Sequence, residues 1–314
     1  MGARPMMLAD RSGQAARRAL FEPTSAWPLA IARVVLGATV FVWSLTMLID
    51  VSSLLGADAV VGPEFADPTW SWLPDGDTWP VVTALIALMV SSVAVILGVR
   101  PTTFLVVSFV LLVAVQRRNP TILNSGDLIL RNLTLLLALC PTGAAMSLDR
   151  VRRLGRGSLF TAADVAPWGL RLVQLQVVVV YFFAFWSKSG GSWRDGTAVS
   201  TALRLDDLQR IGRFDLLIES VPLVALATWG TLAVELALAM LLWCKPLRPW
   251  LIVAALALHL SIDSLLLVGF FGLAMMAGLA TFLDGDAIER LVAARRNARS
   301  ADGQAEADVG APVG

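Results

Sequence analysis

Long uninterrupted apolar stretches dominate this 314-residue sequence. The first, from Pro28 to Ile49, is long enough to cross a bilayer, which needs about 20 residues of α-helix. Charged residues make up only 16% of the chain, whereas soluble domains carry about a quarter. We therefore predict an all-α fold, a polytopic integral membrane helix bundle with about eight transmembrane spans.

The predicted spans are all apolar, with few charged residues. A cytoplasmic N-terminal segment at 1–27 precedes them, and a cytoplasmic, disordered tail at 286–314 follows the transmembrane domain at 28–285. The third and fourth spans are short, and the last two are nearly continuous. The spans are 28–49, 79–98, 101–117, 126–141, 166–187, 221–244, 247–263 and 265–283.

Basic residues predict the orientation, because cytoplasmic loops of membrane proteins are rich in Lys and Arg. If every predicted span crosses, the connections that carry the basic residues given at the end of this paragraph fall on one side, which we expect to be cytoplasmic together with both termini. The first opposite connection, 50–78, holds six acidic residues and no Lys or Arg. A strong preference for Arg over Lys suggests a bacterial source, hence the plasma (inner) membrane. The basic residues on the side predicted to be cytoplasmic include Arg11, Arg17, Arg18, Arg100, Arg150, Arg152, Arg153, Arg156, Lys245, Arg248, Arg290, Arg295, Arg296 and Arg299.

Composition also excludes some functions. The net charge is +1 and no basic tract occurs, which excludes a nucleic-acid partner and leaves membrane lipid as the expected surroundings. His259 is the only histidine, so a multi-histidine metal site is excluded and no metal is expected.

Ionisable residues inside membrane spans are costly and point to functional sites. The first such segment holds Asn124, Asp127 and Arg131 at the start of the fourth span. Asp127 and Arg131 are four residues apart, so they share a helix face and can pair. The pair could simply anchor a helix end, or it could line a polar pocket for an anionic or quinone oxygen.

The second segment covers the end of the fifth span and the loop after it, with Tyr181, Lys188, Trp193 and Asp195. Tyr181 is the only tyrosine, and Lys188 is one of two lysines. Arginine stays protonated, whereas a partly buried lysine can lose its proton and act as a base. The alternative is a lysine that extends from a span end to the membrane surface.

The third segment holds His259 and Asp263, four residues apart in the seventh span, where an imidazole–carboxylate pair is available. A structural histidine is the alternative. Glu235 lies within the sixth span, and we expect it to pair with Arg33 or Arg171.

These segments resemble the horizontally transferred transmembrane (HTTM) domain family, whose characterised member is the vitamin K-dependent γ-carboxylase. The likeness covers about residues 20–285. Its most specific part is Tyr181–Ala184, then Lys188, then Trp193–Gly196; the asparagine at 124 is followed by Ser125, where the carboxylase has a histidine. The other stretches are Asn124–Asp127, Pro141–Gly143, Ser147–Asp149, and His259 followed by Gly269–Gly272.

The resemblance implies a lysine base, at Lys188, that deprotonates a reduced quinone such as menaquinol before oxygen reacts with it. It also implies that His259 lines the same outward-facing intramembrane pocket, to which we assign Asn124, Asp127, Arg131, Tyr181, Trp193, Asp195 and Asp263. An exported peptide or protein would then be the acceptor substrate. The rival hypotheses are a non-enzymatic subunit or scaffold of a larger membrane complex, or a carrier of a lipid or small molecule. A transporter is disfavoured because no paired repeat with interrupted helices is visible.

Overall fold

The computed structural model describes residues 14, 17–56, 59–60, 72–74, 77–210 and 214–309. Within these residues, six helices are long and apolar enough to cross a membrane, which confirms the all-α membrane fold. A seventh span is counted if residues Phe271–Phe282 and Gly285–Ala298, bent by 86° at the break between them, form one. The six helices are α2 (Trp27–Ile49), α4 (Trp79–Leu97), α5 (Pro101–Arg118), α8 (Trp168–Ser187), α12 (Val221–Leu241) and α13 (Arg248–Leu265).

Two of the predicted spans are shorter helices. The span predicted at 126–141 is α6 (Ser125–Ala138), and the one at 265–283 is α14 (Phe271–Leu279) followed by the turn η7 (Ala280–Phe282). The 14 residues of α6 extend about 21 Å, less than the ~30 Å apolar core of a bilayer. Both pack centrally: α14 contacts α2, α6, α8 and α13, so longer neighbours separate it from lipid.

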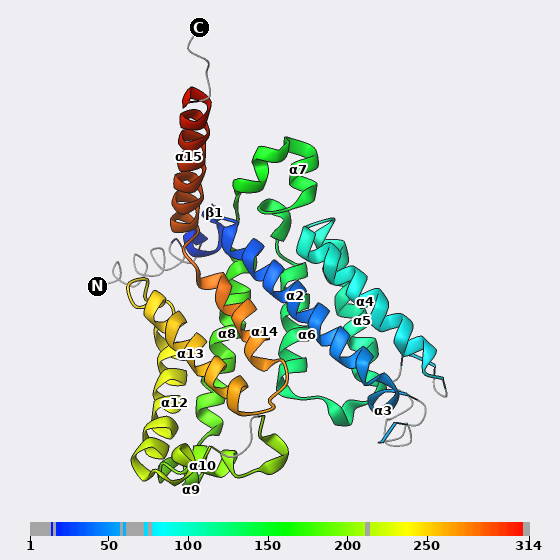
Figure 1. The fold of residues 1–314 in the computed structure, drawn as a ribbon, viewed down its shortest axis with the longest axis vertical. Coiled ribbons are helices and arrows are strands. Elements are labelled where there is room, and N and C mark those ends of the chain that lie inside the picture. The colour runs from blue at the N-terminus through cyan, green and yellow to red at the C-terminus, as the bar shows by residue number, and fades with distance from the viewer. Residues whose placement is uncertain are drawn as a thin grey trace, which may run out of the picture.

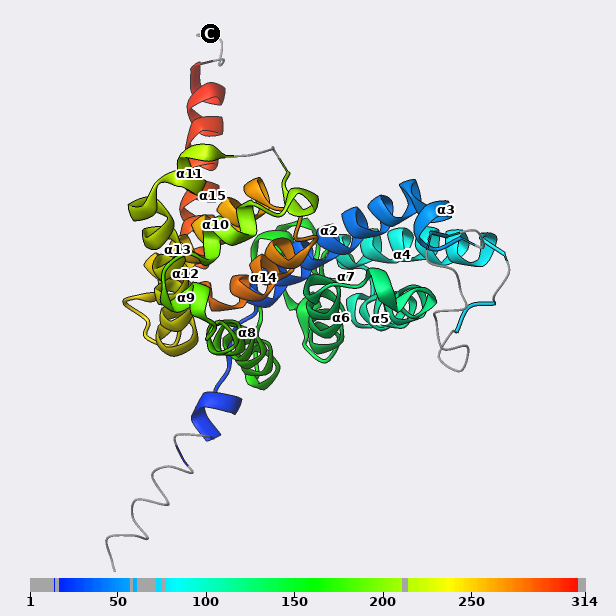
Figure 2. The same cartoon turned by 90° about the horizontal axis from the view of Figure 1, so that it is seen from below.

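The helices are arranged in an elongated array (Figures 1 and 2). Helices α4 and α5 lie at one edge, and α12 and α13 lie at the other. Helix α2 packs on α4, and α8 packs on α12, while the short α6 and α14 lie between these pairs. The apolar core runs through all of these helices, from Leu36 in α2 to Met275 in α14.

The connections that carry Arg100, Arg150, Arg152, Arg153, Arg156, Lys245 and Arg248 lie together at one end of the array, where Figure 1 shows α7 (Leu148–Leu154) and α15 (Gly285–Val309). Arg194, Arg204 and Arg210 lie in the connections at the other end. The strand β1 (Thr24–Ser25) pairs there with β2 (Asp164–Val165), and the backbone N–H of Asp149 donates to Gly98 O. The turns η4 (Thr142–Ala144) and η5 (Arg156–Phe160) complete this end.

The opposite end carries the other connections, among them α9 and α10 at the bottom of Figure 1. Of the acidic residues expected in the loop 50–78, only Asp50 and Asp77 lie in the described part of the chain. The short elements of this end are α3 (Val51–Leu54), η3 (Pro120–Ile122), α9 (Gly191–Arg194), α10 (Ala198–Leu203), η6 (Asp206–Leu208) and α11 (Asp215–Glu219).

Arg33, one of the two expected partners of Glu235, instead holds α2 to the end with the basic connections. It is fully buried, and its guanidinium donates to Val95 O at 2.9 Å and to Met146 O. Gly98 ends α4 with φ +68°, and a Cβ there would lie 2.2 Å from Arg33 Nη1. Glycine is therefore required at 98 both for the backbone conformation and for the space that the guanidinium fills.

The tail predicted to be disordered is a helix as far as it is described. Residues 285–309 form α15, which projects away from the array (Figure 1). Its first turns pack Ile288 and Val292 on the small cluster around Trp27, and its alanines, arginines and glutamates favour helix beyond them. Residues 1–13, 15, 16 and 310–314 of the two predicted terminal segments lie outside the described residues.

Candidate functional site

Lys188 directly follows α8, and its ammonium turns back along the helix. Nζ donates to Ala184 O, one turn earlier, at 3.1 Å, and to the two carboxylate oxygens of Glu235 at 2.7 and 2.9 Å. A lysine that extends to the membrane surface would point the other way, beyond the helix end. Lys188 is therefore directed toward the bundle, although 23% of its side chain remains exposed.

Glu235 is the unexpected member of this group, because the expected partners, Arg33 and Arg171, bind elsewhere. The Arg171 guanidinium donates to Gln174 Oε1 at 2.8 Å and lies over the Trp243 ring. Glu235 lies in the interior of α12 with 8% of its side chain exposed. A buried carboxylate is stable only when it is paired and hydrogen-bonded, and Lys188 meets that need.

Trp193 is the third residue that contacts the ammonium, after Ala184 and Glu235. It belongs to α9, and the centroid of its ring lies 5.4 Å from Lys188 Nζ, within the range of a cation–π contact. Asp195, two residues later, is exposed and ends α9 through its backbone N–H, which donates to Gly191 O. Its carboxylate makes no hydrogen bond or ion pair with the lysine, so the predicted role of Asp195 in the pocket lacks structural support among the described residues.

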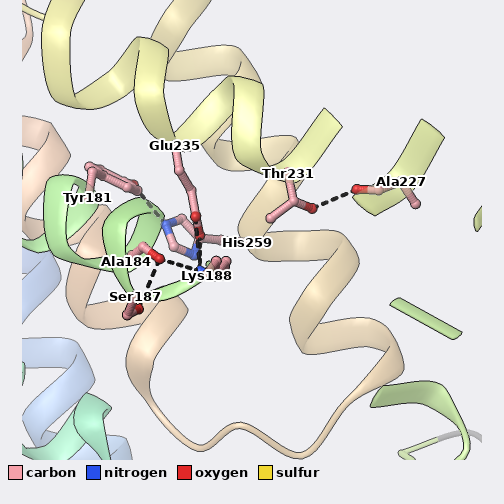
Figure 3. Close-up of polar contacts among 8 residues, drawn as sticks. All are labelled: Tyr181, Ala184, Ser187, Lys188, Ala227, Thr231, Glu235 and His259. Atoms are coloured by element: carbon pink, nitrogen blue, oxygen red, sulfur yellow. Dashed lines mark hydrogen bonds and ion pairs between the residues drawn. The ribbon is translucent and has the colours of Figure 1, made fainter. Parts of the chain in front are cut away.

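Tyr181 and His259 form a second buried pair beside the first. The Tyr181 hydroxyl lies 2.8 Å from His259 Nε2, and the two residues are 2% and 3% exposed. Figure 3 shows Tyr181, His259, Lys188 and Glu235 directed toward one another from α8, α12 and α13. The Lys188–Glu235 ion pair and the Tyr181–His259 hydrogen bond thus lie side by side inside the helix bundle.

The imidazole–carboxylate pair expected within α13 is not formed. His259 Nε2 is bound to Tyr181 on another helix, and Asp263 Oδ1 is buried without a hydrogen-bond partner among the described residues. Asp263 instead packs against α14, where a Cβ on Gly272 would lie 2.2 Å from its Oδ2. Packing between helices therefore overrides the spacing of four residues that favoured the pair.

The Asn124 turn uses its polar groups as a helix cap. Asn124 Oδ1 accepts from the N–H groups of Gly126 and Asp127, and Asp127 Oδ2 accepts from Asn124 N at 2.9 Å. Asp127 Oδ1 accepts from Trp43 Nε1 at 2.6 Å, which ties α6 to α2. The expected Asp127–Arg131 pair is therefore absent from this described segment, because both oxygens of Asp127 are taken.

The residues of the Asn124 cap and those around Lys188 form two adjoining networks, whereas the side chains of Arg131, Asp195 and Asp263 make no hydrogen bond or ion pair with either among the described residues. A Cβ on Gly126 would lie 2.5 Å from Phe271 N, and the Phe271 ring centroid lies 5.8 Å from that of His259. Phe271 thus contacts the Asn124 cap through its backbone and His259 through its ring. The hollow beside the cap, lined by Trp43 and Asp127 among others, measures about 10 Å³, too small for a quinone ring.

The family follows from a sequence comparison that covers most of the chain. A family model of the HTTM domain matches residues 21–286. The chain belongs to the HTTM family. Among curated proteins and among solved structures, nothing matches it. The HTTM match runs from before α2 to the start of α15, so both networks lie within the family domain.

Sequence reasoning missed the two partners that come from other helices, Glu235 for Lys188 and Trp43 for Asp127. A usable signal existed for the first, since Glu235 is the only acidic residue of α12 and Lys188 the only lysine near α8. No comparable signal marks Trp43, which is one of 11 tryptophans in the chain.

Proposed function

We propose that this HTTM protein is a bacterial inner-membrane enzyme that uses a reduced quinone and oxygen, with Lys188 as the base. The observation that carries the proposal is the ammonium of Lys188, turned into the bundle and bonded to the buried carboxylate of Glu235. The site would face the outer side of the membrane, with both termini cytoplasmic, because the basic connections lie at the other end.

The chemistry of the four side chains fits the hydroxyl of a quinol. Lys188 keeps 23% of its side chain exposed, so a hydroxyl can reach Nζ without unfolding the bundle, and Trp193 offers an aromatic face beside it. A reduced quinone bound there would supply, together with oxygen, the oxidative chemistry that the resemblance to the carboxylase implies.

The Lys188–Glu235 pair can transfer the proton of the substrate hydroxyl in two steps. Glu235 takes one proton from the ammonium, which leaves Lys188 as a neutral amine and the carboxyl as a neutral acid. The amine then takes the hydroxyl proton of the substrate: the O–H bond breaks, an N–H bond forms, and the ammonium stays beside the new oxyanion. Tyr181 and His259 line the site and hold α8 and α13 in place around it.

A test combines product detection with variants of the two lysines. Purified protein is given reduced naphthoquinone and oxygen, and quinone epoxide is measured by mass spectrometry for wild type, Lys188→Ala, Lys188→Arg and Lys245→Ala. Lys245, the only other lysine, is exposed at the opposite end and serves as the control. We expect epoxide from wild type and Lys245→Ala only, because arginine does not release its proton. Full activity of Lys188→Ala would refute the base assignment.

The second candidate is a non-enzymatic subunit or scaffold. It is favoured by the saturation of the Lys188 ammonium, which has three oxygen acceptors and a ring around it, as a structural ion pair would. In that case no variant produces epoxide, the purified protein carries no quinone, and Lys188→Arg is as stable as wild type, because charge alone is enough to hold Glu235.

A further inference from the structure

A hollow of about 450 Å³ lies at the end of the array with the basic connections, opposite the end that holds Lys188 and Trp193. It is lined by the start of α5, the turn η4 and one face of α7. Two arginines, Arg150 and Arg153, line it together with apolar groups. The apolar lining residues are Pro101, Pro141, Ala144 and Leu154.

Arg150 has an unused donor at this hollow. Its Nη2 donates to Thr161 Oγ1 at 3.3 Å, whereas its Nε–H is buried and has no acceptor among the described residues. Buried polar groups normally find a partner, so an unpaired buried donor on a residue that lines a cationic hollow indicates a missing polar ligand.

The charge of the lining favours an anion. The segment 149–156 contains four arginines and one carboxylate, Asp149, which also lines the hollow. That carboxylate is already engaged: Oδ2 accepts from Arg100 N at 2.6 Å, and Oδ1 lies 3.6 Å from Arg152 Nη1. The guanidinium of Arg153 is exposed, and within the described part of the chain its one hydrogen bond is from Nε to Asp149 O at 3.2 Å. Guanidinium groups bind phosphate oxygens well because their fork of donors matches them.

The surroundings indicate where the phosphate comes from. The hollow lies beside the turn between the spanning helices α4 and α5, which is the depth of lipid headgroups. Leu154, which lines the hollow, is 64% exposed, and Phe160 in the adjoining turn η5 is 51% exposed. We propose that this hollow binds the phosphate group of an anionic phospholipid, with Arg150 and Arg153 on the headgroup and the exposed apolar side chains along its acyl chains.

The test is a lipid titration of the purified full-length protein followed by native mass spectrometry. The probes are phosphatidylglycerol, neutral phosphatidylcholine and millimolar inorganic phosphate. The variants are Arg153→Gln and Arg150→Gln/Arg153→Gln, and the matched control is Arg290→Gln/Arg295→Gln, which removes two exposed charges of α15 at the same end. Arg153 is exposed, so its single variant reports on binding even if loss of Arg150 disturbs the fold.

We expect phosphatidylglycerol to bind wild type and the α15 control equally, and the double variant about tenfold or more weakly. Arg153→Gln should fall between them, and phosphatidylcholine should bind weakly throughout. Equal binding of phosphatidylglycerol by wild type and both hollow variants would overturn the proposal, as would an equal loss in the α15 control. Binding of inorganic phosphate without binding of phosphatidylglycerol would overturn the lipid source and leave a site for free phosphate.

Discussion

Lys188 Nζ lies 2.7 Å from one carboxylate oxygen of Glu235 and 2.9 Å from the other, and this pair joins α8 to α12 inside the bundle. The ammonium is partly exposed and the carboxylate is not. The two groups are therefore unequal: Lys188 is the only cation paired with Glu235 within the described residues, whereas Lys188 can also reach solvent.

Glu235→Gln should lower the free energy of unfolding by about 1–3 kcal/mol, because it leaves the ammonium without its counter-ion. Thermal unfolding of the purified protein measures the change. The exposed pair of Arg152 and Asp149, with an Nη1–Oδ1 distance of 3.6 Å, provides the control, and Arg152→Gln should change stability by less than about 1 kcal/mol. Replacing both Lys188 and Glu235 with methionine should recover part of the loss; if it does not, the pair is not the source of the stability.

Tyr181→Phe removes one hydroxyl and leaves His259 Nε2 buried without its partner. We expect a loss of about 1–3 kcal/mol in unfolding free energy, the cost of an unsatisfied buried polar group. Phe182→Leu, one residue along the same helix but 39% exposed, is the control and should have a smaller effect. Equal stability of Tyr181→Phe and wild type would show that the hydrogen bond does not form in the folded protein.

Asp127→Ala should destabilise the protein by about 2 kcal/mol, since it removes the acceptor of Asn124 N in the capping box of α6 and the acceptor of Trp43 Nε1. Asn124→Ala removes the cap but spares the Trp43 bond, so it should cost less than Asp127→Ala. Urea or thermal unfolding of both variants compares them. A larger loss in Asn124→Ala than in Asp127→Ala would contradict the importance of the link to α2.

Gly126→Ala and Gly230→Ala form a matched pair of helix substitutions. A Cβ at 126 would lie 2.5 Å from the backbone nitrogen of Phe271, whereas a Cβ at 230 meets nothing within 4 Å. Gly126→Ala should therefore destabilise the packing of α6 on α14, and Gly230→Ala should leave stability unchanged or raise it by up to about 1 kcal/mol. Unfolding temperatures of the two variants, measured side by side, test the close approach of these short helices.

The long spans could be predicted because the length and apolarity of a helix that faces lipid are set by the bilayer itself. Helices α6 and α14 are shorter than this rule requires because each packs on several longer helices, although α6 keeps an exposed apolar stripe at Leu128 and Leu135. The tail from 286 was predicted to be disordered from its polarity, yet α15 packs Ile288 and Val292 on the cluster around Trp27 and extends through Val309.

The side-chain partners were less predictable. Both pairs expected from a spacing of four residues, Asp127 with Arg131 and His259 with Asp263, lost to partners on other helices, Trp43 and Tyr181. Helices that are apolar all round carry little periodic information about how they are rotated, so the sequence alone does not reveal which face meets which neighbour. The candidate residues themselves could be found, since ionisable groups are rare within these spans.

The sparse packing of α13 has a consequence for access to the site. Only Ala255 and His259 of this helix are buried, and His259 is held by the Tyr181 hydroxyl. A molecule that hydrogen-bonds to either of these atoms must compete with the bond between them, and so with the attachment of α13 to α8. Its apparent affinity will therefore include the free energy needed to detach this peripheral helix from α8. Because most of α13 faces outward from the bundle, its displacement would open the site to the hydrocarbon interior of the membrane, where a lipid-soluble compound dissolves.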